Sequence, residues 1–135
     1  EQAQFDYSVV KETTFKKQPV IIIQVAPKPG AAGNVLYGKV WVRKSDAGIL
    51  RIEWQPESMG NYEGIEEMAR ELGMKPRLSF VSEYDFEKNG IRFPSRYEIE
   101  EAYSSKVRAT LVRSRTEVTY DAYKFFTVET GVAIR

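Results

Sequence analysis

The sequence contains no cysteine and no histidine. Without cysteine, the chain cannot form disulfides, thiolate nucleophiles or cysteine-ligated zinc sites. Without histidine, it lacks the usual general base at neutral pH, so Ser-His-Asp, Cys-His and zincin sites are excluded. These absences remove the familiar hydrolytic and metal-dependent chemistries, and we expect a binding domain that is not an enzyme and uses no metal or cofactor.

The sequence also has little net charge and no long apolar run. Its 20 Lys and Arg residues stand against 19 Asp and Glu residues, which gives a formal charge of +1. No summed field therefore attracts nucleic acid or an anionic membrane. The longest unbroken apolar stretch is Val20 to Ile23, far below the roughly 18 residues of a membrane span. We expect a chain that does not span a membrane and does not bind nucleic acid.

What the sequence does contain is a series of β-rich segments separated by turn signals, the pattern of a β meander. About eight strands are predicted, at residues 5–12, 19–26, 36–44, 49–55, 78–88, 91–103, 107–115 and 118–133. The segment from Lys28 to Asn34 carries one Pro and two Gly and is predicted to be a loop. The 135 residues suit one domain, and we treat 1–135 as a single unit.

Two predicted hairpins have recognisable turns. Ser45-Asp-Ala-Gly48 is short, and its Gly supplies the positive φ that a tight turn requires. Asn89-Gly90 is the favoured type I′ dipeptide, so the long strands on either side of it are predicted to pair. Pro94 has no N–H for a strand ladder and marks a bulge or an edge position.

One short helix is predicted from about Tyr62 to Leu72, because Ile65, Met68, Ala69 and Leu72 recur at spacings of three and four. Gly73 follows as a stop signal. A long meander with a single short helix excludes a parallel βαβ fold. It leaves a barrel, a partial barrel or a strongly curved antiparallel sheet.

Two motifs resemble functional sites in the wrong structural context. Tyr120 and Lys124 have the spacing of the short-chain dehydrogenase Tyr-x-x-x-Lys pair, but no Gly-rich βα turn precedes them. Gly30-Ala-Ala-Gly33 resembles a phosphate loop, but a strand follows it where such a loop requires a helix. We interpret the first as a chance match and the second as a hairpin loop.

The carboxylates of Glu98, Glu100 and Glu101 are candidates for glycosidase-like acid–base chemistry. Strand alternation places Glu98 and Glu100 on a polar face beside Arg92 and Arg96, which favours cross-strand ion pairs instead.

Another candidate site is a strand face that carries aromatic and basic residues. It is formed by Tyr37, Lys39, Trp41 and Arg43, and it could stack single-stranded bases. The near-zero net charge favours a solvated sheet face instead.

Aromatic residues are abundant: eight Tyr, seven Phe and two Trp make up 13% of the chain. In several predicted strands both faces carry large apolar side chains, as where Trp41 opposes Val40 and Val42. A second apolar face requires either a cover, such as the helix, or a ligand. The predicted ligand-binding residues share one face of three strands: Leu50, Ile52, Trp54, Phe80, Tyr84, Phe93 and Tyr97.

Three stretches together resemble bacterial outer-membrane lipoprotein-sorting proteins, the LolA/LolB-like group. They are Gly38-Lys-Val-Trp-Val-Arg-Lys-Ser-Asp46 leading into Leu50-Arg-Ile-Glu53, Arg92-Phe-Pro-Ser-Arg-Tyr97, and Thr119-Tyr-Asp-Ala-Tyr-Lys-Phe-Phe-Thr127. The resemblance implies an unclosed antiparallel β barrel whose concave side is capped by helices. Together with the strand and helix pattern, it predicts a mainly β fold in which a curved antiparallel meander forms an unclosed half barrel with one short helix. It also implies a concave side that accepts acyl chains. The single helix departs from the several lid helices of that group, and no functional residue is carried over.

Two functions follow as expectations. The first is a non-enzymatic envelope domain that binds an apolar ligand, either a lipid or a lipoprotein acyl chain, on the concave face. The second is a protein-interaction or structural domain that docks a partner on its sheet face or edge. The expected location is the periplasm or cell envelope, and the first residue, Glu1, is compatible with a removed signal peptide.

Overall fold

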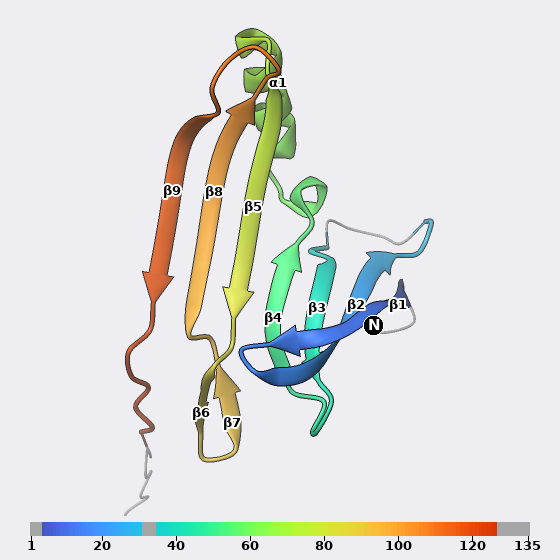
Figure 1. The fold of residues 1–135 in the computed structure, drawn as a ribbon, viewed down its shortest axis with the longest axis vertical. Helices are drawn as coiled ribbons and strands as arrows, with labels where there is room; N and C mark the ends of the chain where they lie inside the picture. The colour runs from blue at the N-terminus through green and yellow to red at the C-terminus, as the bar shows by residue number, and fades with distance from the viewer. Residues whose placement is uncertain (1–3, 31–34, 127–135) are drawn as a thin grey trace, which may run out of the picture.

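A computed structural model describes residues 4–30 and 35–126 and shows a mainly β protein (Figure 1). Seven strands form one antiparallel sheet in the order β1-β2-β3-β4-β5-β8-β9, and β6 and β7 form a separate two-stranded hairpin. The strands are β1 (Phe5–Phe15), β2 (Gln18–Pro27), β3 (Gly38–Arg43), β4 (Ile49–Trp54), β5 (Lys75–Glu83), β6 (Phe86–Lys88), β7 (Ile91–Phe93), β8 (Arg96–Ser104) and β9 (Leu111–Thr119). Since β1 and β9 remain separate edges, the sheet does not close into a barrel. The predicted fold class, an open antiparallel meander with one short helix, is confirmed.

The first hairpin is longer than its apolar pattern predicts. Pairing between β1 and β2 continues to Phe15 and Gln18, and the turn is made by Lys16 and Lys17, both at positive φ. Lysine is unusual in this conformation, so the sequence carries no turn signal here. Residues 31–34 of the loop expected after β2 lie outside the described residues.

The turn between β3 and β4 forms where it is predicted, but a different residue takes the left-handed conformation. Ala47, not Gly48, has positive φ, at 58°. The Asp46 carboxylate accepts a hydrogen bond from the Gly48 backbone N–H at 3.0 Å, and the Gly48 carbonyl accepts one from the Arg43 N–H at 2.8 Å. An Asp side chain that bonds its own backbone two residues on is a known turn device, and here it fixes the turn without glycine torsions.

The long hairpin predicted around Asn89-Gly90 is divided into two parts. Its turn has the predicted type I′ character, with φ of 54° at Asn89 and 74° at Gly90. The strands, however, are interrupted near Asp85 and Pro94: β5 pairs with β8 in the main sheet, and only β6 and β7 flank the turn. Pro94 cannot donate to a ladder, which accounts for the break.

The last two predicted strands become one. Residues 105–110 form a loop in which the Ser105 hydroxyl accepts the backbone N–H groups of Val107 and Arg108 at 3.2 and 3.0 Å. Strand β9 follows, and the chain from Tyr120 to Phe126 is not a strand. Residues 127–133 of the predicted final strand lie outside the described part of the chain.

The helix forms as predicted and lies at one end of the long strands (Figure 1). It is α1 (Tyr62–Leu72), preceded by the short 3₁₀ helix η2 (Pro56–Ser58). Gly73 ends it in the left-handed conformation, at φ 64°, and the Met74 N–H then donates to the Ala69 carbonyl at 2.9 Å. Because Met74 leads directly into β5, α1 packs against the beginning of that strand. The middle of the sheet has no helix over it in the described structure.

The strand register defines two faces, since side chains alternate along each strand. One cross-strand row joins Ile23, Val40, Ile52, Ser82, Tyr97 and Val118. We call this side, which also carries Trp54 and Phe80, the aromatic face. The opposite side carries Arg51, Glu53, Glu83, Arg96, Glu98, Arg115 and Glu117, and we call it the charged face.

The sheet curls towards its charged face at the β1–β2 end. Strand β1 has a bulge between Val9 and Lys11 and crosses in front of β3 (Figure 1); bulges bend a strand in this way. The end of the hairpin lies over the charged face, because Lys16 Nζ is 3.1 Å from Glu83 Oε2 and the Arg51 guanidinium is 5.8 Å from the Phe15 ring. The apolar ligand-binding residues were predicted on the concave side of the sheet, whereas at this end they lie on the face opposite β1.

Candidate functional site

A row of aromatic rings crosses the aromatic face from β4 to the end of β9. Trp54 and Phe80 have ring centroids 6.0 Å apart, Phe80 and Tyr97 6.3 Å, and Tyr97 and Tyr120 6.4 Å. The first three rings are half-buried, and Tyr120 is exposed. We call Trp54, Phe80, Tyr97 and Tyr120 the aromatic row. No second layer of structure covers this row within the described residues, so it offers apolar area and ring edges to a ligand.

The polar end of Trp54 is already satisfied within the protein. Its indole Nε1–H donates to the Ser82 hydroxyl at 3.0 Å, and Ser82 itself is buried. A buried indole usually finds such a partner, and the bond fixes the plane of the ring. Trp54 therefore presents an apolar edge in a defined orientation.

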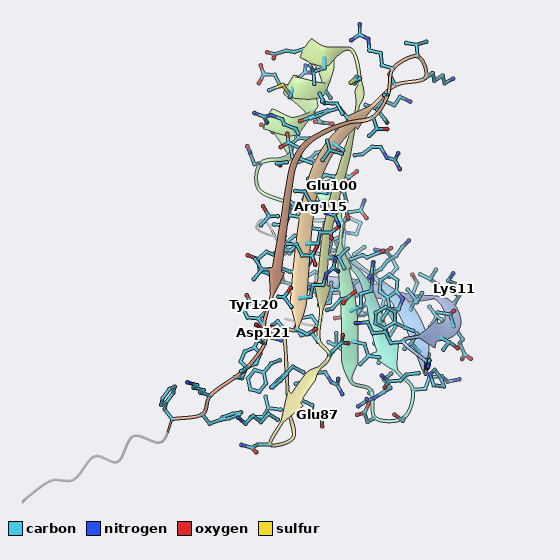
Figure 2. The ribbon with its side chains drawn as sticks, turned by 60° about the vertical axis from the view of Figure 1, so that its left-hand side comes forward. Lys11, Glu87, Glu100, Arg115, Tyr120 and Asp121 are labelled. Atoms are coloured by element: carbon cyan, nitrogen blue, oxygen red, sulfur yellow. The ribbon has the colours of Figure 1, made fainter. Side chains whose placement is uncertain are left out.

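A second group of rings connects the aromatic row to the β6–β7 hairpin. Tyr123 lies 5.9 Å from Tyr120, 4.5 Å from Phe93 and 5.3 Å from Phe86, and Phe93 lies 5.6 Å from Phe125. We call Tyr123, Phe86, Phe93 and Phe125 the hairpin cluster. Figure 2 shows Tyr120 and Asp121 at the end of β9, where the chain leaves towards the hairpin that carries Glu87.

Two polar contacts hold this segment in place. The Tyr123 hydroxyl donates to the Pro94 carbonyl at 2.5 Å, and Lys88 Nζ donates to the Tyr123 carbonyl at 2.9 Å. The Lys88 ammonium also lies 5.5 Å from the centre of the Phe125 ring, a distance at which cations attract aromatic faces. The segment after β9 is therefore a strap across the hairpin.

A cavity of about 520 Å³ lies where the β3–β4 turn meets the β6–β7 hairpin. Its apolar wall includes Ile49, Ile52 and Tyr84, and its polar wall includes Arg92 and Glu87. The volume is within the range of small-molecule sites. The Arg92 guanidinium is committed inside the protein, since it donates to the Tyr84 carbonyl at 3.1 Å and to Glu87 at 2.9 Å.

Asp46, which also lines this cavity, is held in its charged form. Hydrogen bonds from the Arg43 guanidinium and from the Gly48 backbone N–H keep the pKa of the Asp46 carboxyl well below its usual range. The acidic and basic groups around the cavity are paired with one another, and an apolar wall remains open between them.

The structure divides the predicted ligand-binding residues among separate places. Trp54, Phe80 and Tyr97 form most of the aromatic row. Ile52 and Tyr84 line the cavity. Phe93 belongs to the hairpin cluster. Leu50 is 1% exposed and belongs to the core, because a bulge opposite Val42 places it as the extra residue of β4.

The sequence prediction missed Phe86 of β6 and three aromatic residues after β9, Tyr120, Tyr123 and Phe125. The last three lie in the stretch Thr119 to Thr127, and Tyr120 and Tyr123 fall within the rejected dehydrogenase-like motif. Local alternation could not place them, because they follow β9 in an irregular segment. The high density of aromatic residues in this stretch was the sequence signal that pointed to them.

The charged face is a network of ion pairs centred on Glu83. Its carboxylate is 3.1 Å from Lys16 Nζ, 3.2 Å from Arg51 Nη1 and 3.6 Å from Arg96 Nη1. Glu83 is 7% exposed, and a carboxylate buried to that extent needs such partners. Arg51 also lies 5.3 Å from the Trp41 ring. Trp41, whose strand face was considered and rejected as a platform for stacked bases, is thus engaged within the protein.

The three carboxylates weighed as glycosidase candidates are also paired. Glu98 contacts Arg96 and lies 3.0 Å from Arg115 Nη2, and Figure 2 shows Glu100 and Arg115 on neighbouring strands. Glu101 is on the other face, where hydrogen bonds from Tyr103 and Arg113 lower its pKa. These contacts agree with the predicted ion-pairing role, although Arg92 pairs with Glu87 instead of joining them.

Neither metal ligands nor a membrane-spanning helix are found where the structure describes the chain. No group of Asp and Glu residues within the described ranges has an arrangement that could hold a metal ion. In the same residues, no helix has the length and apolar character needed to cross a membrane.

No family model matches this chain, and no curated protein or solved structure matches it either. The resemblance to the LolA/LolB-like group therefore stays a prediction from the three sequence stretches.

Proposed function

We propose that this chain is a non-enzymatic domain of the bacterial cell envelope that binds an apolar ligand, a lipid or a lipoprotein acyl chain, on its aromatic face. The observation that carries the proposal is the aromatic row, which lies on a sheet face with no helix over its middle in the described structure. The sequence resemblance to lipoprotein-sorting proteins supports the location and the ligand class.

The position of the helix argues for a ligand in place of an internal cover. An apolar sheet face is normally buried against a second layer of structure. Here α1 packs against the beginning of β5, and the described structure contains no other helix except the short η2. The half-buried rings of Trp54, Phe80 and Tyr97 are left as the surface that an apolar molecule would cover.

The arrangement of the four rings suits an extended acyl chain more than a compact ligand. The rings follow one another across neighbouring strands at separations of 6.0 to 6.4 Å. A methylene chain laid along them would lose its contact with water over its length, at about 25 cal/mol per Å² of buried apolar area. Ordering the chain reduces this gain, which gives a reversible complex.

The two tryptophans allow a direct test, because they lie on opposite faces of the sheet. Trp41→Phe leaves Trp54 as the only indole reporter, and Trp54→Phe leaves Trp41. We expect a long-chain fatty acid brominated along its acyl chain to quench Trp54 fluorescence in the first variant. Trp41 in the second variant should not respond, because it packs on Arg51 on the charged face.

The matched control is the same fatty acid without bromine, which should leave the intensity of Trp54 almost unquenched. Quenching of both tryptophans to the same extent would mean nonspecific association. Absence of quenching at Trp54 at any ligand concentration below micelle formation would refute the proposal.

Docking of a protein partner is the second candidate, and one observation favours it. The aromatic face is open, with Tyr7 56% exposed and Val9 68% exposed at its β1 end. Open apolar surface rimmed by polar residues is typical of protein contacts. A Trp54 signal that ignores fatty acid but changes when an envelope protein partner is titrated would support this candidate.

A further inference from the structure

The outer edge of β9 is the free edge of the sheet that is best prepared to accept another strand. On its inner side β9 pairs with β8, and no described strand pairs with its outer side. Almost all of its side chains are exposed. An unpaired row of backbone N–H and C=O groups is a template for adding a strand.

The hydrogen-bond register shows which residues of β9 face outward. The Tyr120 N–H donates to the Ser95 carbonyl at 2.9 Å, and Tyr97, Ile99 and Glu101 oppose Val118, Thr116 and Ser114 in the same register. Hydrogen-bonded residues alternate along an antiparallel pair. Val118 and Thr116 therefore bond β8, whereas Arg115 and Glu117 direct their backbone groups to the free edge.

The other edge of the sheet is less suited to pairing. Strand β1 is bulged between Val9 and Lys11 and curls over the charged face. Bulges and lysines on an edge strand discourage further pairing. Figure 2 shows Lys11 and Arg115 on strands at opposite edges of the sheet. The stretch of β9 from Ser114 to Thr119 has no register shift against β8 and contains neither Pro nor Gly.

The charges along this edge are complementary to themselves. If two copies of β9 meet antiparallel with Thr116 opposite Thr116, then Arg115 of each copy faces Glu117 of the other. Both side chains are about half exposed, although within one copy Arg115 also contacts Glu98 and Glu117 contacts Arg96. Opposite charges directly across a ladder are stabilising, like charges are destabilising, and Thr–Thr pairs are favourable.

Neighbouring registers lack this match. Centring the pair on Arg115 brings two arginines together, and centring it on Glu117 brings two glutamates together. Only the register centred on Thr116 uses the outward backbone groups of Arg115 and Glu117 and also pairs opposite charges.

We propose that β9 is a self-association edge, at which a second copy of this chain adds antiparallel around Thr116 to form a continuous sheet with two-fold symmetry. Such an isologous contact uses the same patch on both copies. On the aromatic face the junction is lined by Ser114, Thr116 and Val118, so the aromatic row stays open in the dimer. The inference is independent of the ligand proposed above.

The first experiment measures association of the whole chain by sedimentation velocity and amide hydrogen exchange over a concentration series. We expect a monomer–dimer equilibrium. The amides of Arg115 and Glu117 should exchange slowly only where the dimer is populated, whereas those of Thr116 and Val118 are protected in both states by β8. A chain that stays monomeric to about 1 mM, the weak limit of measurable affinity, would overturn the proposal.

Charge reversal tests the register. Arg115→Glu places four glutamates at the junction and Glu117→Arg places four arginines there, so each variant alone should dimerise about tenfold more weakly or worse. An equimolar mixture of the two should recover association as a heterodimer, because every cross-strand pair is again of opposite charge. A parent dimer that neither reversal weakens would place the interface elsewhere and refute the proposal.

A proline variant separates edge pairing from folding. Glu117→Pro removes an N–H that points to the free edge, and proline is tolerated on edge strands in that orientation. Its control is Glu117→Ala, which also loses the contact with Arg96 at 3.1 Å but keeps the N–H. We expect equal unfolding midpoints, weaker association of Glu117→Ala because the cross-strand pairs with Arg115 are lost, and complete loss of the dimer in Glu117→Pro. Equal association of the two variants would contradict the proposal.

Discussion

At the scale of single residues, the charged face depends on Glu83. It is the least exposed carboxylate of that face, and cations from three separate strands or turns meet it: Lys16, Arg51 and Arg96. The contact with Lys16 joins the end of the β1–β2 hairpin to β5. One side chain thus connects the curled end of the sheet to its centre.

We predict that Glu83→Gln lowers the free energy of unfolding by about 2 kcal/mol. The substitution leaves cations around a partly buried neutral group, and breaking a buried pair from one side costs several kcal/mol. The partners are partly exposed, with 44% of the Lys16 side chain accessible, so solvent screening reduces the loss. Urea unfolding followed by circular dichroism measures it.

The matched control is Glu117→Gln at the outer end of the same network, where the side chain is 45% exposed. This exposed pair should contribute less than about 1 kcal/mol. Equal effects of the two substitutions would show that burial of Glu83 does not strengthen its ion pairs.

At the scale of elements, the β6–β7 hairpin is held by the segment that follows β9. The hairpin has only three residues in each strand, and such hairpins are marginal alone. Tyr123 contacts Phe86 and Phe93 and bonds the Pro94 carbonyl. The strap therefore connects distant parts of the chain and stabilises one wall of the cavity.

We predict that Tyr123→Ala opens the hairpin locally without unfolding the main sheet. Loss of the ring removes its stacking and its hydrogen bond, so amides of Phe86 to Phe93 should exchange at least about tenfold faster. Amides in the middle of β5 and β8 should keep their protection. Hydrogen exchange followed by mass spectrometry resolves the two regions.

Phe126→Ala is the control for this change. Phe126 follows the hairpin cluster but is 83% exposed, and its substitution should leave hairpin exchange unchanged. If Phe126→Ala and Tyr123→Ala acted alike, the stacking of Tyr123 on Phe86 and Phe93 would not be what holds the hairpin.

At the scale of the whole molecule, the protein is essentially one curved layer. Among the described residues, the fully buried apolar side chains are few, and they include Val20 on the charged side, Leu50 in β4 and Tyr103 near the helical end. In the described structure, β1 covers one end of the charged face, and α1 covers one end of the aromatic face. A ligand over the aromatic row would supply part of the missing layer.

We predict that a long-chain fatty acid raises the thermal stability of the protein. Any molecule that binds only the folded state at about 100 times its dissociation constant adds about 2.7 kcal/mol. Phe80→Ala, at the centre of the row, should weaken binding about tenfold or more through lost apolar contact. Differential scanning calorimetry with and without ligand measures both effects.

Phe15→Ala is the control on the opposite face, where Phe15 packs near Arg51. It should lower stability without changing the increment due to the ligand. An equal increment in parent and Phe80→Ala would place the binding site away from the aromatic row.

Local signals predicted much of the fold. The helix and its stop at Gly73, the turn at Asn89-Gly90, and the meander order follow from periodicity and turn chemistry. The positive φ at Ala47 and at Lys16 and Lys17 was not predictable in this way, because register and side-chain bonds outweigh residue preference there. The candidate site was half predicted: Trp54, Phe80 and Tyr97 lie in regular strands, whereas Tyr120 and Tyr123 do not.

The sequence by itself determined the class of structure and the chemistries this chain lacks. Alternation and turn residues require an antiparallel meander, and the absence of His and Cys excludes their reactions. Only the tertiary structure decided which face is open. The direction in which β1 curls and the place where α1 docks depend on contacts between distant residues, such as Lys16 with Glu83. No local pattern encodes these contacts, and they leave the aromatic row uncovered.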